Sequence, residues 1–143
     1  MVRKLIFILV LASLAAGCGP SRPDDAPAPF DRGNASFEKG DWDKAIAEHD
    51  KAIQLKPDFA EAYNNRGQAR LAKGDYDRSI SDLDKAIQLK PDLAQAYLNR
   101  GLALTGQAKK TEAIADLKKC VELTTDPDLR KEAEQALSEL GAQ

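Results

Sequence analysis

The stretch DKAIQLKPD occurs twice in this chain without a change, at residues 50–58 and again at residues 84–92. The two copies start 34 residues apart, and aligning the chain on that interval divides most of it into three units. Each unit contains two segments whose apolar residues recur at helical spacing. A repeat of this length predicts a stack of helix pairs, each burying its apolar face against the next. The units are residues 26–59, 60–93 and 94–127.

The repeated stretch combines the end of one helix with the start of the next. Pro91 cannot continue a helix, so the second helix of the middle unit is expected to end before it. Asp92 lies three residues before Gln95, which is the spacing of a capping box for the following helix. Asp58 and Glu61 have the same spacing one unit earlier. We therefore expect Asp58 and Asp92 to begin helices.

A second short signal, KGD, lies between the two helices of the first and middle units. Gly74 can adopt the left-handed conformation that ends a helix, and Asp75 can cap the helix that follows. The third unit departs from this pattern, since Ala108 replaces the turn glycine and Thr125 replaces the terminal proline.

The repeat resembles the tetratricopeptide repeat (TPR) family over about 100 residues. The resemblance implies an all-α fold, a solenoid of three helix-turn-helix repeats. Pro27 and Pro29 are expected to shorten the first helix of the first unit. The positions of the family signature are occupied by Gly33, Gly40, Trp42, Ala45, Ala52 and Pro57 in the first unit, by Tyr63, Gly67, Gly74, Tyr76, Ala86 and Pro91 in the second, and by Tyr97, Gly101, Ala113 and Leu117 in the third.

The C-terminal segment predicts a capping helix at residues 127–140, which completes a repeat domain spanning residues 30–143. Asp126 can cap this helix, and Pro127 suits its first position. We expect the apolar side of the helix to cover the last repeat, because the end of a solenoid otherwise exposes its core. That side consists of Leu129, Ala133, Ala136, Leu137 and Leu140.

The N-terminal residues 1–17 have the layout of a secretory signal peptide. Arg3 and Lys4 precede an apolar run at residues 5–16, which is shorter than the roughly 20 residues that cross a bilayer. The sequence LAAGC resembles the lipobox of bacterial lipoproteins, which implies cleavage after residue 17 and lipid on Cys18. An ordinary secreted protein that is cut near this point is the alternative.

Residues 18–29 form the expected lipid-anchored linker. Four prolines lie between residues 19 and 29, and such a segment acts as a semi-rigid spacer. In lipoproteins of Gram-negative type, Asp after the lipidated cysteine favours the inner membrane. Gly19 occupies that position here, so the resemblance implies a lipid-anchored protein of the bacterial cell envelope, on the outer membrane and facing the periplasm.

Several function classes find no support in the sequence. The net charge of −2 makes a nucleic-acid partner unexpected. His49 is the only histidine and no CxxC motif is present, so we expect neither a metal site nor a cofactor, and a half-buried packing role for His49. Cys120 falls at a small buried position of the repeat. No nucleophile–base pair is recognisable, and the chain is not expected to be an enzyme.

Three arginines share one position of the repeat, and an acidic residue follows each of them 16 residues later. We expect partly buried ion pairs that join the two helices of each unit and determine their register more than they stabilise them. The expected pairs are Arg32 with Glu48, Arg66 with Asp82, and Arg100 with Asp116.

The TPR resemblance implies that the first helix of each pair lines a concave groove for a partner peptide or helix. Amides can bind a peptide backbone there, and exposed apolar groups can accept its side chains. By position, the expected partner-binding residues are Asn34, Phe37, Asn64, Gln68, Leu71, Leu98 and Leu102, with Phe30, Glu61, Gln95 and Thr105 also on the lining.

Some TPR domains bind a C-terminal carboxylate with lysines and asparagines. Asn34 and Asn65 match two asparagines of that clamp, but Phe30, Gln95 and Asn99 stand where the family has basic residues. Binding of a chaperone tail is therefore not expected.

The sequence thus predicts a non-enzymatic adaptor or scaffold lipoprotein that binds an unidentified protein or peptide in its groove. The alternative is a self-associating structural lipoprotein. In that case Phe30 or Phe37, on the uncapped first helix, would pair with a second copy and form a homodimer.

Overall fold

The computed structural model describes residues 28–141, which form seven α-helices and no strand. The predictions for residues 1–17, for Cys18 and for the linker up to residue 27 lie outside the described residues. The helices are α1 (Pro29–Glu38), α2 (Trp42–Leu55), α3 (Ala60–Ala72), α4 (Tyr76–Leu89), α5 (Ala94–Gly106), α6 (Lys110–Leu123) and α7 (Pro127–Glu139).

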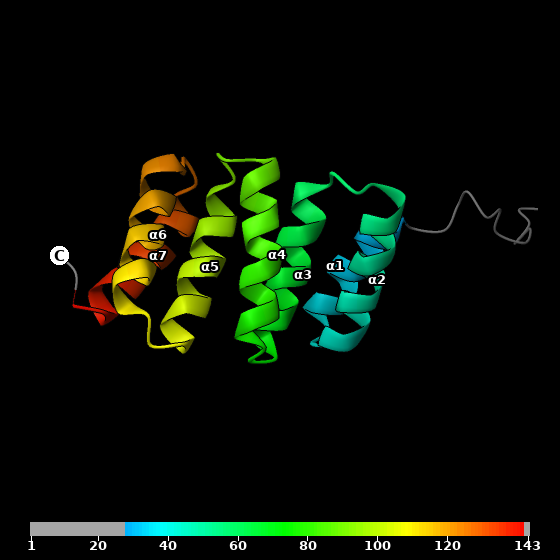
Figure 1. Ribbon diagram of the computed structural model, residues 1–143, viewed down its shortest axis with the longest axis horizontal. Coiled ribbons are helices and arrows are strands. Elements are labelled where there is room, and N and C mark those ends of the chain that lie inside the picture. Colours follow the sequence, from blue (N-terminus) through cyan, green and yellow to red (C-terminus); the bar gives the residue numbers. More distant parts are fainter. Residues whose placement is uncertain (1–27, 142–143) are drawn as a thin grey trace, which may run out of the picture.

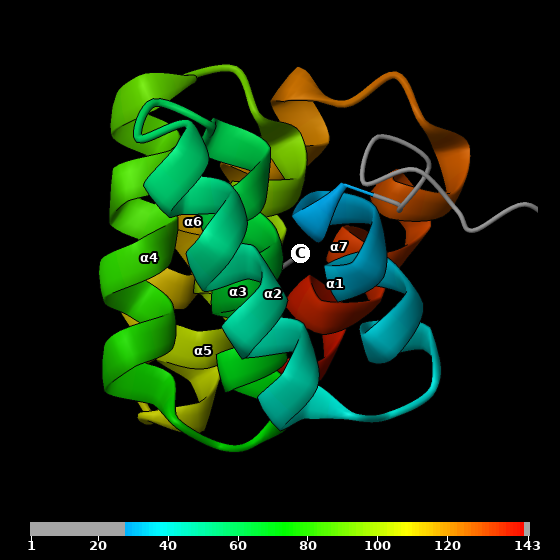
Figure 2. The same cartoon turned by 90° about the vertical axis from the view of Figure 1, so that its right-hand side faces the viewer.

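The helices stack in sequence order as three pairs, α1–α2, α3–α4 and α5–α6, and α7 packs on the last pair (Figure 1). The odd-numbered helices form one row, in which α1 contacts α3, α3 contacts α5, and α5 contacts α7. Contacts of this kind are absent between α2 and α4 and between α4 and α6 among the described residues. The odd-numbered row is therefore the inner, concave side, and the other row is the outer side (Figure 2). This arrangement is the predicted all-α TPR solenoid with three repeats and a capping helix.

The turns within the pairs form as the KGD signal predicts. Gly74 has a φ of +77°, and the carboxylate of Asp75 accepts a hydrogen bond from the backbone N–H of Arg78 at 3.4 Å. The first unit repeats this geometry, since Asp41 accepts from the N–H of Lys44 at 3.2 Å. A left-handed glycine followed by a capping aspartate thus determines both turns.

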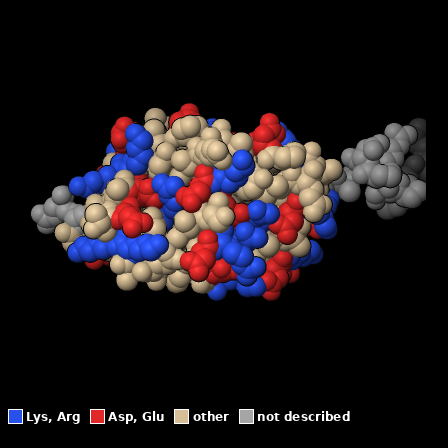
Figure 3. Space-filling view, in the orientation of Figure 1, with Lys and Arg blue, Asp and Glu red and all other residues tan. Residues whose placement is uncertain are grey.

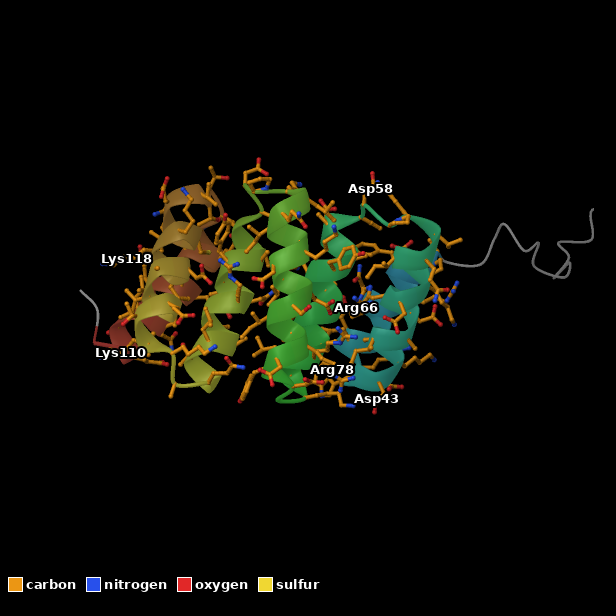
Figure 4. The ribbon with its side chains drawn as sticks, viewed as in Figure 1. Asp43, Asp58, Arg66, Arg78, Lys110 and Lys118 are labelled. Atoms are coloured by element: carbon orange, nitrogen blue, oxygen red, sulfur yellow. The ribbon has the colours of Figure 1, made fainter. Side chains whose placement is uncertain are left out.

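The capping boxes predicted between the units are wrong. The N-cap residues of α3 and α5 are Phe59 and Leu93, and neither helix start has a side-chain cap. Asp58 instead lies exposed in the loop before α3 (Figure 4). The half-buried side chains of Phe59 and Leu93 pack against the core, so apolar packing, rather than a capping carboxylate, determines where these helices begin.

The first helix begins at Pro29, one residue before the predicted domain boundary, with the proline in the first turn. It has 10 residues, whereas α3 and α5 have 13 each. The shorter first helix agrees with the prediction made from Pro27 and Pro29. At the other end, Asp126 accepts from the N–H of Asp128 at 2.9 Å and caps α7.

Close contacts at glycine join the two helices of each pair. A Cβ added to Gly67 would lie 2.9 Å from Leu83, and one added to Gly101 would lie 2.9 Å from Leu117. Cys120 is fully buried near Leu117, and burial raises the pKa of its thiol to about 11. This thiol therefore packs as a small apolar group.

Ala108 adopts a φ of +59° at the position that Gly74 occupies in the preceding unit. This conformation costs an L-residue about 1–2 kcal/mol. We expect Ala108→Gly to raise the free energy of unfolding by about 1 kcal/mol, since part of the gain is offset by the greater freedom of unfolded glycine. Urea unfolding measures the change.

The matched control is Gly74→Ala, because nothing lies within 4 Å of a Cβ added at Gly74 and only backbone strain is introduced. We expect Gly74→Ala to lower the free energy of unfolding by about as much as Ala108→Gly raises it. If Ala108→Gly left stability unchanged while Gly74→Ala lowered it, the turn of the third unit would not be strained.

Candidate functional site

The three predicted arginine pairs are present, and those of Arg66 and Arg100 are more extensive than the sequence suggested. Arg66 Nε donates to Asp82 Oδ2 at 2.9 Å and Arg66 Nη2 to Asp82 Oδ1 at 2.5 Å. Arg66 Nη1 also donates to Asp50 Oδ1 at 2.6 Å. The guanidinium of α3 thereby connects its own partner α4 to α2 of the preceding unit.

The third unit repeats this pattern. Arg100 donates to Asp116 at 2.7 and 2.8 Å and to Asp84 at 2.7 Å. In the first unit Arg32 Nε donates to Glu48 Oε2 at 2.7 Å. The pairing of each arginine with the acid 16 residues later is confirmed.

The sequence interpretation missed the second acid that binds Arg66 and the second acid that binds Arg100. Asp50 and Asp84 lie 16 residues before Arg66 and Arg100, and each is the first residue of a DKAIQLKPD stretch. The repeated spacing was therefore a signal that could have identified them. The DKAIQLKPD stretch thus recurs in part because its aspartate at the first position joins one unit to the next.

The guanidinium groups stay charged in this network. Burial works against the charge of Arg66, but the hydrogen bonds that it donates to Asp82 and Asp50 outweigh burial and raise its pKa above the ordinary value. Arg70 Nη1 donates to the same Asp82 at 2.7 Å. These arginines are consequently occupied by carboxylates of the outer helices.

A cavity of about 270 Å³ opens on the inner row of helices. It brings together four of the residues predicted for the groove lining: Asn34 and Phe37 from α1, Gln68 from α3 and Gln95 from α5. Polar groups dominate its lining, and Phe37 supplies an apolar wall. The full lining is Asn34, Phe37, Glu38, His49, Asn65, Gln68 and Gln95.

A chain of side-chain amides crosses the inner row beside this cavity. Asn99 Nδ2 donates to Asn64 Oδ1 at 3.0 Å, Asn64 Nδ2 to Asn65 Oδ1 at 2.9 Å, and Asn65 Nδ2 to Asn34 Oδ1 at 2.8 Å. The chain links α5, α3 and α1. It ends at Asn34. The N–H groups of Asn34 Nδ2 donate no hydrogen bond to another group within residues 28–141.

His49 lies at the base of the same cavity and is fully buried, not half-buried as predicted. Neither ring nitrogen has a hydrogen-bond partner among the described residues. Burial lowers the pKa of His49 to about 4, so the ring is neutral at neutral pH. Its ring lies 5.6 Å from that of Phe30, and a Cβ on Gly33 would lie 2.5 Å from it.

Two predicted groove residues lie below the surface. The prediction for Leu98 is wrong, because α7 packs over it and leaves 2% of it exposed, in a cluster with Leu117, Cys120 and Ala133. Asn64 is 3% exposed and acts within the amide chain. A partner in the groove would therefore contact the side chains around Leu98 and Asn64 rather than these two residues.

The remaining predicted residues lie nearer the surface. Leu71 is half-buried on α3. Leu102 is half-buried on α5 and lines a second inner cavity, of about 290 Å³, against α7. The other residues of this second cavity are Glu132, Gln135, Ala136 and Glu139.

The two aromatic residues suggested for dimer formation have partners within the chain. The ring of Phe30 lies 4.7 Å from that of Phe59, and the ring of Phe37 lies 4.7 Å from that of Trp42. Both side chains are half-buried.

The part of the chain that the structure describes contains no group of three or more His, Cys, Asp or Glu side chains placed to bind a metal ion. Within the same residues, none of the helices has the length and apolar character needed to cross a membrane.

The fold and groove define a solenoid of helix pairs, and comparison with known families agrees. A family model described as TPR repeat matches residues 33–74 and 67–107, and a model described as tetratricopeptide repeat matches residues 94–127. The first model alone covers just over half of the chain. The chain belongs to the tetratricopeptide repeat family. No curated protein matches it in sequence.

Solved structures with the same fold include several peptide complexes. The TPR domain of Arabidopsis OM64 is 29% identical, with a TM-score of 0.74 over 79% of this chain and 91% of that one. The second TPR domain of human RPAP3, in complex with an HSP70 peptide, is 28% identical, with a TM-score of 0.73 over 81% and 94%. The first TPR of Spaghetti (RPAP3), bound to the HSP90 peptide SRMEEVD, is 25% identical, with a TM-score of 0.70 over 80% and 91%.

Proposed function

We propose that this chain is a non-enzymatic adaptor that binds a peptide or helix of a partner protein in its concave groove. The observation that carries the proposal is the inner cavity where Asn34, Phe37 and Gln68 meet beside the amide chain. Free amide groups can bind a peptide backbone, and the apolar wall can accept a side chain. The peptide complexes of similar TPR domains support the same use of this surface.

The ligand of those similar domains is not the expected one here. Three positions at which the carboxylate clamp has basic residues are neutral in this chain. Phe30 packs on His49, Asn99 is buried and donates to Asn64, and Gln95 is exposed. These three positions therefore offer an acidic C-terminal tail no positively charged side chain.

The groove is tested by comparing the wild type with Leu71→Glu/Leu102→Glu in a membrane pull-down. We expect specific partners to be recovered at least about tenfold less well. Burying an uncompensated carboxylate against an apolar segment costs more than the roughly 1.4 kcal/mol that a tenfold change represents. Circular dichroism verifies that the variant is folded.

The matched control is Leu55→Glu, since Leu55 lies on the outer helix α2 and is 76% exposed. This variant should recover the same partners as the wild type. Partners that bind all three proteins equally would rule out the groove as their site.

We further propose that Cys18 carries lipid and anchors the domain to the bacterial cell envelope, on the outer membrane facing the periplasm. The LAAGC sequence and the apolar run before it support this proposal. One lipid chain binds membranes only marginally, so stable anchoring requires several. Cys18→Ala is expected to abolish palmitate labelling and to release the protein from the membrane fraction. Unchanged membrane association would contradict a lipid anchor at Cys18.

Self-association through the uncapped end of α1 is the alternative function. The contacts of Phe30 with Phe59 and of Phe37 with Trp42 leave less apolar surface for such a dimer. Sedimentation over a range of concentrations separates a monomeric adaptor from a homodimer.

A further inference from the structure

The inner helices of the three repeats contribute no free cation to the groove. Helices α1, α3 and α5 contain no lysine and four arginines. Every one of these arginines donates to a carboxylate on an outer helix, so its charge is directed away from the concave side. The bonds join Arg32 to Glu48, Arg66 to Asp82 and Asp50, Arg70 to Asp82, and Arg100 to Asp116 and Asp84.

Carboxylates, by contrast, line both inner cavities. Glu38 lines the first cavity, and Glu132 and Glu139 line the second. Neither lining includes a lysine or an arginine. None of the three carboxylates takes part in a salt bridge observed within residues 28–141, and Glu139 accepts only from Gln135, at 3.1 Å. The outer face differs, since positive and negative side chains alternate over it (Figure 3).

A second observation at the first cavity also concerns hydrogen bonding. His49 is fully buried at its base and neither ring nitrogen is paired. A neutral imidazole has one acceptor nitrogen and one donor. The base of the cavity is therefore uncharged, and Glu38 supplies the one formal charge in its lining.

We propose that the groove selects a partner segment that carries arginine or lysine side chains beside apolar ones. The cationic groups would donate to Glu38 in the first cavity and to Glu132 and Glu139 in the second. Arginine is favoured over lysine, because a guanidinium binds a carboxylate with two parallel hydrogen bonds. The groove thus prefers a basic segment, whereas a similar TPR domain is bound to the acidic peptide SRMEEVD. This inference rests on the proposed function, because it specifies the partner of the same groove.

The test uses labelled synthetic peptides with one alanine–leucine frame that carry arginine, glutamine or glutamate at the same positions. Fluorescence anisotropy measures their binding to the full chain at low ionic strength. We expect the arginine peptide to bind about tenfold more tightly than the glutamine peptide, and the glutamate peptide not to saturate. Glu38→Gln/Glu139→Gln should remove most of the preference for the arginine peptide over the glutamine peptide, with Glu132 retaining the rest.

The matched control is Glu112→Gln/Glu122→Gln, which removes the same charge from α6, outside the groove. It should bind the arginine peptide as the wild type does. The inference is overturned if the three peptides bind alike, if none saturates, or if both double variants lose affinity equally. The proposed function fails independently of these results, when cellular partners still bind Leu71→Glu/Leu102→Glu.

Discussion

Replacing Asp82 with alanine is expected to lower the free energy of unfolding at neutral pH by about 3–4 kcal/mol. The carboxylate is only 5% exposed and accepts hydrogen bonds from Arg66 and Arg70, whose side chains are each 16% exposed. Its removal leaves Arg70 without an acidic partner and Arg66 with only Asp50. Breaking a buried ion pair from one side costs several kcal/mol, because the remaining charge stays buried without compensation. Urea unfolding monitored by circular dichroism measures the loss.

Asp84→Ala is the matched control in the same helix. Asp84 accepts one hydrogen bond, from Arg100, and is 56% exposed, so its loss should cost less than about 1 kcal/mol. Equal losses in the two variants would mean that burial does not determine the strength of these pairs. A loss below 1 kcal/mol at Asp82 would mean that the arginines regain solvent when the carboxylate is removed.

Replacing His49 with leucine is expected to stabilise the protein at pH 7 by about 2 kcal/mol. Both ring nitrogens are buried without partners, and one unsatisfied buried polar group costs about 1–3 kcal/mol. Leucine is compatible with this position, since Leu83 and Leu117 occupy it in the other two units, each packed against a glycine. In the first unit the equivalent glycine is Gly33, which contacts the imidazole.

The stabilisation should increase as the pH falls. The folded-state pKa of His49 is about 4, whereas an unfolded histidine titrates near 6.5. The unfolded chain therefore binds the proton first, and the wild type loses stability between pH 6.5 and about 4. The loss attributable to His49 reaches about 3 kcal/mol at the lower limit. The difference between His49→Leu and wild type should rise from about 2 to about 5 kcal/mol.

Comparing the two proteins at each pH isolates His49, because all other titrating groups are common to both. Leu83→His is the converse variant and should acquire the same sensitivity to acid. If the difference between wild type and His49→Leu stayed constant from pH 7 to pH 4, the imidazole would be reached by water in the folded protein.

The features predicted correctly depend on residues close together in the chain or on the repeat itself. Gly74 and Asp75 form a turn from neighbouring residues, so their types suffice to predict it. The pairing of Arg66 with Asp82 was predictable because the spacing recurs in every unit. The groove residues were predicted only in part, since Phe37 and Gln68 line the cavity whereas Leu98 does not.

The features that were missed depend on contacts between units. The amide chain from Asn99 to Asn34 connects three helices, and only Asn65 and Asn99 among its members share a position of the repeat. Asp58 was expected to cap a helix, but the packing of Phe59 places the helix start one residue later. Local preferences worth about 1 kcal/mol do not prevail over the burial of an aromatic side chain.

The sequence by itself determined the helix pairs, their turns and the 34-residue register, because the periodic burial of apolar residues and the residue in the left-handed conformation at each turn are local properties that every unit repeats. Tertiary structure alone decided what the groove exposes. Capping by α7 buries Leu98, the arginines are directed outward by acids of two helices, and His49 is enclosed beneath Phe30. These outcomes depend on which surfaces stacking covers, and that is a property of neighbouring units rather than of any one of them.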